Sequence, residues 1–154
     1  MKRIICIGNR YIRQDSAGPA VYDTLSRQEL PPDIELVDGG LAGLNLLGLF
    51  DDAELVVVVD NVSGFSRHNG TVVLESEDII PLAGNSYDHA SGLPYLLRTL
   101  HEIFEGTPPR VVVVGIEGDF NESIIADAAR LALRTAEDGC CSHVAIDGLP
   151  GSVL

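Results

Sequence analysis

The fold is decided by the stretch Ile4-Ile5-Cys6-Ile7-Gly8-Asn9-Arg10-Tyr11-Ile12-Arg13-Gln14-Asp15-Ser16-Ala17-Gly18-Pro19. Its first four residues are apolar and predict a buried strand, and a helical pattern begins near Ala17 after a short polar loop. A strand, a loop and a helix in this order place the loop at the carboxyl edge of a sheet, where open α/β proteins keep their sites. Asp15 lies in this loop and is therefore the first candidate for a site residue.

The composition of the 154-residue chain is that of a globular domain, with 45% hydrophobic and 21% charged residues. No apolar run approaches the roughly 18 residues of a membrane-spanning helix. The first apolar run is also too short for a secretory signal, so we expect a cytoplasmic protein. The net charge of −13 argues against nucleic acid as a partner, because binding phosphates requires clustered lysine and arginine.

Five segments have the apolar, β-branched character of strands, namely residues 2–7, 34–37, 54–59, 70–75 and 110–114. Four segments with helical spacing alternate with them, namely residues 17–30, 41–50, 91–104 and 124–137. This alternation predicts an α/β fold with a mostly parallel five-stranded sheet and helices on both faces. We expect a single three-layer domain over residues 1–139. Residues 140–154 are expected to be a C-terminal tail, with a short strand followed by frayed chain.

Several familiar catalytic signatures are absent from the sequence. There is no G-x-S-x-G elbow, no phosphate-binding G-x-x-x-x-G-K-[ST] loop and no H-E-x-x-H zinc motif. The three cysteines, Cys6, Cys140 and Cys141, lack the paired spacing of a zinc site and are interpreted as reduced thiols. The candidates for chemistry are therefore polar residues at the ends of apolar elements.

Four such residues stand out, namely Asp15, Asp38, Asp60 and His89. Taken singly, Asp15 is better explained as a helix cap and His89 as a surface histidine, while Asp38 suits a turn as well as a site. Asp60 differs, because a carboxylate directly after a central strand is costly to desolvate unless a cation offsets it. Together, Asp15, Asp60 and His89 form a three-ligand set suited to a borderline transition metal with open coordination positions.

The chain contains a series of short motifs in a fixed order. They are Gly8-Asn9 with Asp15 and Gly18-Pro19, then Glu35-Leu36-Val37-Asp38-Gly39-Gly40, Val57-Val58-Val59-Asp60, His89-Ala90-Ser91-Gly92-Leu93 and Val113-Val114-Gly115-Ile116-Glu117. In this order and spacing, over about residues 3–117, they resemble the hydrogenase maturation endopeptidases. Members of that family are peptidases that remove a C-terminal extension from the large subunit of [NiFe] hydrogenases.

The resemblance implies that Asp15, Asp60 and His89 act in catalysis as metal ligands. The metal would be nickel that the substrate already carries, so no tightly bound metal of the protein's own is expected. Asp38 falls on the family's Asp-Gly-Gly turn, which implies a part in recognition or cleavage, for example as the general base. The implied partner is the precursor of a hydrogenase large subunit, and we favour a monomer.

The chain departs from the family pattern at two positions. Gln14 stands where the family commonly has a second acid, and Asn61 follows Asp60 where the family commonly has alanine. Two other functions therefore stay open. One is a self-contained metallohydrolase that carries its own zinc on the same three ligands, and the other is a non-catalytic, metal-dependent binding module.

Overall fold

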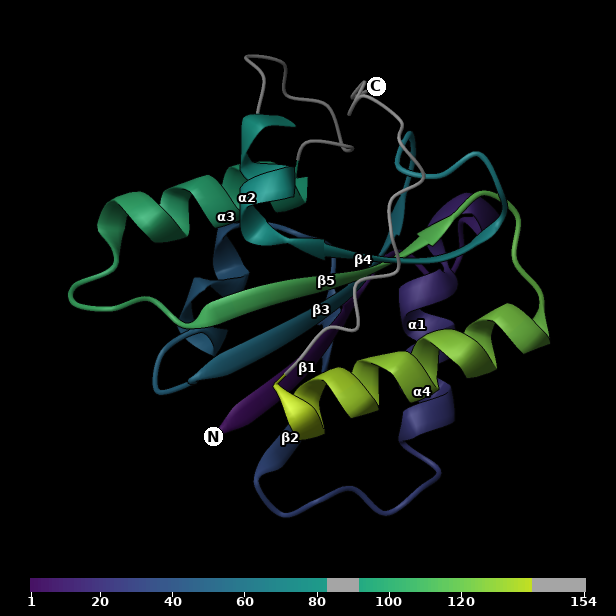
Figure 1. Cartoon of the computed structure of the whole chain (residues 1–154), viewed down its shortest axis with the longest axis horizontal. Helices are drawn as coiled ribbons and strands as arrows, with labels where there is room; N and C mark the ends of the chain where they lie inside the picture. Colours follow the sequence, from purple (N-terminus) through teal and green to yellow (C-terminus); the bar gives the residue numbers. More distant parts are fainter. Residues whose placement is uncertain (83–91, 140–154) are drawn as a thin grey trace.

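Five strands form one sheet in the order β2-β1-β3-β5-β4 in a computed structural model, which describes residues 1–82 and 92–139 (Figure 1). β1, β2, β3 and β5 run parallel, and β4 lies antiparallel to β5 at one edge. The predicted α/β fold with a mostly parallel five-stranded sheet is thus confirmed. The strands are β1 (Lys2–Ile7), β2 (Ile34–Gly40), β3 (Leu55–Val62), β4 (Gly70–Glu75) and β5 (Arg110–Glu117).

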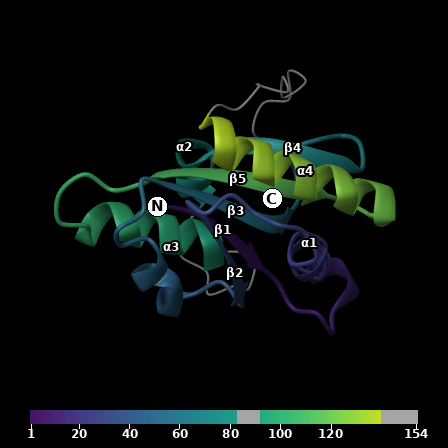
Figure 2. The same ribbon diagram turned by 90° about the horizontal axis from the view of Figure 1, so that it is seen from below.

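Helices cover both faces of this sheet, because the valine-rich strands β3 and β5 bury side chains on either side. On one face α1 and α4 pack against alternate residues such as Cys6, Val57 and Val112. On the other face α3 and the short helix η2 pack against residues such as Val58 and Val113. Figure 2 shows α3 and α4 on opposite sides of the sheet. The helices are η1 (Arg13–Asp15), α1 (Ala17–Leu25), η2 (Leu44–Leu49), α2 (Ser76–Ile79), η3 (Ile80–Leu82), α3 (Gly92–Ile103) and α4 (Glu122–Asp138).

Three parallel strands extend further toward the carboxyl edge than the sequence indicates. β2 continues to Gly40, β3 to Val62 and β5 to Glu117, so that Asp60 lies within a strand and pairs with Gly115. The strand ends were predicted at the first polar side chain. The strands continue further because their backbone N–H and C=O groups pair as long as a neighbouring strand is present. Asp38 and Asp60 are therefore held by strand pairing rather than by free loops.

The first helix is shorter than predicted, since α1 ends at Leu25 rather than near residue 30. Leu25 is the last buried residue of this helix, and exposed residues follow it. The Ser26 hydroxyl donates to the Asp23 carbonyl oxygen at 2.9 Å and satisfies one of the helix-end carbonyls. The short helix predicted over residues 41–50 is the 3-10 helix η2, which spans only Leu44–Leu49.

Gly18, in the first turn of α1, lets this helix approach the end of β1 closely. A Cβ atom at this position would lie 2.0 Å from the Ile7 carbonyl oxygen, so only glycine fits. This contact sets the distance between α1 and the carboxyl edge of the sheet.

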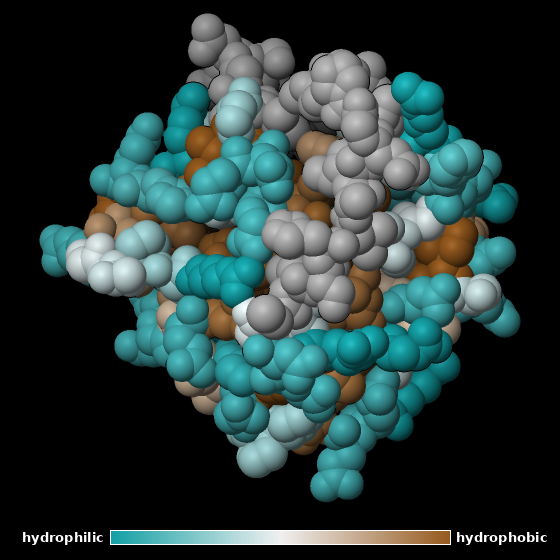
Figure 3. All heavy atoms as spheres, viewed as in Figure 1, coloured by the Kyte–Doolittle hydropathy of each residue, from teal (hydrophilic) through white to brown (hydrophobic). Residues whose placement is uncertain are grey.

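The predicted tail, residues 140–154, lies outside the described residues, and so do Cys140 and Cys141. In the part of the chain that the structure describes, none of the helices is both long and apolar enough to cross a membrane. Among the coloured residues in Figure 3, hydrophilic ones are the more numerous on this face, with apolar areas between them.

Candidate functional site

The loop after β1 closes on itself and fixes Asp15 at the carboxyl edge of the sheet. The Asn9 N–H donates to the backbone oxygen of Asp15 at 2.8 Å and lies 3.2 Å from its Oδ2. Gly8 adopts φ +145°, and a Cβ there would come within 2.3 Å of the Asp15 carbonyl oxygen. The Gly8 N–H also donates to the Gly40 carbonyl oxygen at 2.7 Å. A glycine at this position is therefore required for the loop to carry Asp15 back to the strand end.

Asp60 lies near the end of the central strand β3, partly buried. Its pKa is raised well above the ordinary value of 3.8, first because burial strips water from the carboxylate and second because the carboxylate of Asp15 repels it. A backbone hydrogen bond from Asn61 offsets only part of this effect. The structure thus brings Asp15 and Asp60 close enough to interact, as the sequence predicts.

Asn61 joins the end of β3 to the start of α1. Its Oδ1 accepts a hydrogen bond from the Ala17 N–H at 3.1 Å. Ser16, the N-cap residue of α1, makes no side-chain cap hydrogen bond, so Asn61 supplies a cap from another element. The sequence marks Asn61 only as a departure from the family pattern, because a cap that comes from 44 residues away leaves no local signal.

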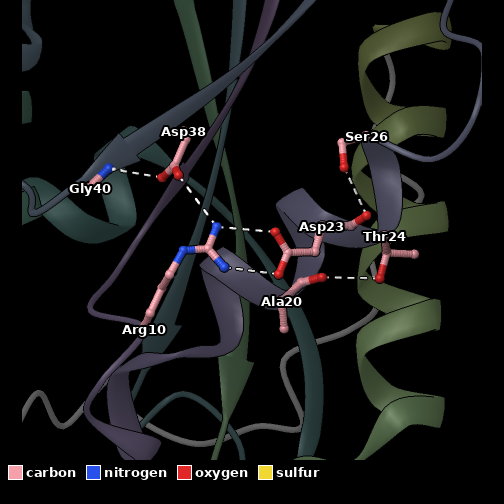
Figure 4. Close-up of polar contacts among 7 residues, drawn as sticks. All are labelled: Arg10, Ala20, Asp23, Thr24, Ser26, Asp38 and Gly40. Carbon is pink, nitrogen blue, oxygen red and sulfur yellow. Dashed lines mark hydrogen bonds and ion pairs between the residues drawn. The ribbon is translucent and has the colours of Figure 1, made fainter.

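Asp38 belongs to a separate ion-pair cluster around Arg10 (Figure 4). The Arg10 guanidinium donates to both carboxylate oxygens of Asp23, at 2.9 and 3.1 Å, and to Asp38 Oδ2 at 3.4 Å. The second oxygen of Asp38 accepts from the Gly40 N–H at 3.3 Å. The Asp38 carboxylate is thus engaged by an arginine while its side chain remains 41% exposed.

Asp38 and Asp60 project from opposite faces of the sheet. Asp38 pairs in register with Cys6, whose side chain packs among the residues beneath α1 and α4. Asp60 alternates with Val58, whose side chain packs on the α3 face, and residues two apart share a face. The structure therefore does not group Asp38 with Asp15 and Asp60, and its catalytic role stays a prediction.

Cys6 behaves as the small apolar group that the sequence indicates. Its thiol is fully buried in the core, and this burial, together with the charges of Asp38 and Asp23, raises its pKa to about 12. It stays protonated at neutral pH and is not a nucleophile.

The third predicted metal ligand, His89, lies outside the described residues. Within residues 1–82 and 92–139, no group of three or more His, Cys, Asp or Glu side chains is placed to hold a metal ion. In the same ranges, the ion pairs formed by lysine and arginine do not include Asp15 or Asp60. Two neighbouring carboxylates without a cationic partner can accept a cation that another molecule brings.

Glu117, the last residue of β5, is a further acidic side chain at this edge, and it is buried. In the sequence, Glu117 is noted only as the last residue of the motif at residues 113–117. Nothing in the local pattern signals that its carboxylate is enclosed, because the groups that enclose it come from a loop more than 50 residues away.

Comparison with known proteins gives a consistent result. The sequence model described as HycI, hydrogenase maturation protease, matches residues 19–138, a range that includes Asp38 and Asp60 and begins after Asp15. The chain is 27% identical over 117 residues to the hydrogenase 2 maturation protease of Escherichia coli K12, covering 73% of this chain and 70% of that protein. It is 32% identical over 119 residues to a putative hydrogenase maturation protease of Methanocaldococcus jannaschii, covering 75% and 74%.

The fold is similar to that of the hydrogenase maturating endopeptidase HybD from E. coli. The TM-score is 0.75 at 22% identity, and the match covers 90% of this chain and 93% of the other. This likeness independently confirms the arrangement of sheet and helices.

Proposed function

The chain belongs to the hydrogenase maturation protease family and is a peptidase, and we propose that it removes the C-terminal extension of a nickel-loaded [NiFe] hydrogenase large subunit. In this proposal the substrate's own nickel is the recognition element. Asp15, Asp60 and His89 contact it, and the protein holds no tightly bound metal of its own. The partner is the large-subunit precursor, and the reaction takes place in the cytoplasm.

The observation that carries the proposal is the electrostatic conflict between Asp15 and Asp60. Burial and, second, the neighbouring charge of Asp15 raise the pKa of Asp60, so the pair is unfavourable while it is fully ionised. A divalent cation on the substrate would convert this repulsion into attraction, and the two carboxylates would become ligands. His89 would supply a nitrogen ligand that suits nickel.

This arrangement explains why a correctly loaded substrate would be preferred. A precursor without nickel would meet two carboxylates with no cation between them, and docking at the sheet edge would lose its main attraction. Cleavage also needs a polarised carbonyl group and an activated water, and a metal ion can supply either. Asp38 is the candidate general base in this proposal, because its carboxylate is exposed at the same carboxyl edge.

The proposal is tested by incubating the purified chain with a nickel-loaded large-subunit precursor and following the released peptide by mass spectrometry. Asp15→Asn, Asp60→Asn and His89→Ala should each abolish cleavage. Asp119→Asn, which alters an exposed acid in the turn after β5, is the matched control and should cleave normally. Failure of the unsubstituted chain to release a peptide from any such precursor would contradict the proposal and favour the binding module.

Metal analysis separates the proposal from the self-contained zinc enzyme. The chain purified without added metal should contain far less than one metal ion per protein. A stoichiometric zinc content that disappears in Asp60→Asn would instead favour the zinc enzyme.

A further inference from the structure

Glu117 combines deep burial with incomplete hydrogen bonding. Its side chain is 7% exposed, and the other buried polar residues in the described ranges are Ser76 and Thr135, neither of which is ionisable at neutral pH. One carboxylate oxygen, Oε2, is buried without a hydrogen-bond partner in the described part of the chain. Such an oxygen costs free energy, and an apolar side chain of similar size would avoid this cost. The carboxylate therefore calls for an explanation other than stability.

The other oxygen, Oε1, accepts hydrogen bonds from three consecutive backbone N–H groups. Gly64 N lies 2.7 Å from it, Phe65 N 3.3 Å and Ser66 N 3.5 Å. Successive backbone N–H groups that point to one place form a concavity that suits an acceptor oxygen. Glu117 thus holds the loop that leaves the end of β3.

The same strand end carries Asp60. In the parallel register Asp60 lies opposite Gly115 and Val62 lies opposite Glu117. At the usual strand spacings, the Cα atoms of Asp60 and Glu117 are about 8 Å apart. Because residues two apart share a face, the side chains of Asp60 and Glu117 both project toward the α3 face.

A second contact fixes this strand end independently of Glu117. A Cβ atom at Gly115 would lie 2.5 and 2.9 Å from the two methyl carbons of Val62, so the absence of a side chain there lets Val62 pack directly on β5. Glu117 thus fixes residues 64–66 through hydrogen bonds, and Gly115 fixes Val62 through side-chain packing.

We propose that Glu117 is a positioning residue for the peptidase reaction, which holds the end of β3 and thereby sets the Asp60 carboxylate against Asp15. Its enclosed oxygens do not touch the substrate. The role rests on the proposed function, in which Asp60 contacts the substrate's metal, and it acts through hydrogen-bond acceptance rather than through charge. A displacement of a reacting group by about 1 Å can lower a rate on the order of 100-fold, so a small shift of this strand end has a measurable effect.

The test compares E117L and E117Q in the full chain. Leucine has a similar size but offers no acceptor, whereas glutamine keeps one oxygen for the same three amides. In E117L we expect the amides of Gly64, Phe65 and Ser66 to exchange with deuterium about tenfold faster. We expect kcat for peptide release to fall about tenfold or more with KM nearly unchanged. In E117Q both the amide exchange rates and kcat should be close to those of the unsubstituted protein.

Thr135→Val is the matched control, because it removes one buried hydrogen bond, from the Thr135 hydroxyl to the Leu131 carbonyl oxygen, on α4, which covers the face of the sheet opposite to α3. It should change neither the loop exchange nor kcat. If E117L does not fold, E117M carries the same test, because methionine is close to glutamate in size and unbranched but offers no oxygen acceptor to the three amides.

Three results would overturn the inference. They are unchanged exchange at residues 64–66 in E117L, faster exchange with an unchanged kcat, and loss of kcat in E117Q with the loop amides still protected. The exchange measurement needs no substrate, so failure of the proposed function would appear separately, as a lack of cleavage by the unsubstituted protein.

Discussion

Together with the larger effect of burial, the carboxylate of Asp15, in the loop after β1, raises the pKa of Asp60 near the end of β3. The two residues are 45 positions apart, and the sheet order brings them together because β1 and β3 are neighbours with Cys6 opposite Val59. Like charges placed together, here with no lysine or arginine ion pair to either among the described residues, are a common feature of sites that bind cations or transfer protons. This relationship gives the site its chemical character.

Removal of the Asp60 charge should stabilise the metal-free protein at neutral pH. Because the pKa of Asp60 is higher in the folded than in the unfolded state, the folded state binds the extra proton, and stability falls as the pH rises from below 3.8 through the folded pKa. Asp60→Asn removes this loss, so its Tm at pH 7 in the presence of a chelator should exceed that of the unsubstituted protein. A gain of about 1 kcal/mol would raise Tm by about 2–4 °C.

The difference between the two proteins should shrink as the pH falls toward 3.8, where the carboxyl group also becomes protonated in the unfolded chain. Thermal unfolding between pH 4 and pH 8 measures this trend, with Asp119→Asn as the exposed control. An Asp60→Asn variant that is less stable than the unsubstituted protein at pH 7 would show that Asp60 is not under electrostatic strain.

Asn61→Ala should destabilise the protein although alanine is the residue that the family commonly has there. The substitution removes the acceptor of the Ala17 N–H and leaves the start of α1 without this cap. The expected cost is about 1 kcal/mol, typical of a lost helix cap, and appears as a lower urea midpoint with an unchanged m-value. An unchanged midpoint would mean that water replaces the Asn61 side chain without loss.

Asp38 and Arg10 can be separated by a pair of substitutions. If Asp38 is the general base, Asp38→Asn should lower kcat roughly 100-fold or more, as expected for loss of general-base catalysis. Arg10→Met should lower it much less, because it leaves the Asp38 carboxylate in place and removes only the exposed ion pairs. Equal losses in the two variants would instead mean that Asp38 acts by anchoring Arg10 and its loop.

Much of the fold could be predicted because its strands are uninterrupted apolar runs. The valine-rich segments of β3 and β5 can be buried only between two layers of helices, and this fixed the fold class. The ends of the elements were less predictable. Backbone pairing carried β3 past Asp60 to Val62, and α1 stopped at Leu25, where its buried face ends.

The site was predictable in part for the same reason. Asp15 and Asp60 each come after an apolar run of a parallel strand, so their convergence at one edge follows from parallel topology. Asp38 also comes after an apolar run, but it lies within β2, where side chains alternate between the two faces, and it projects to the face opposite to Asp60, toward Arg10. The cap from Asn61 and the burial of Glu117 depend on contacts between segments distant in the sequence, which no local pattern records.

The central claim is that Asp15 and Asp60 contact a metal that arrives with the substrate. It is tested most directly by incubating the purified, metal-free chain with one large-subunit precursor in two forms, nickel-loaded and nickel-free. The masses of the products are then measured by mass spectrometry. We predict release of the C-terminal peptide from the nickel-loaded form alone. Equal cleavage of both forms would contradict the account.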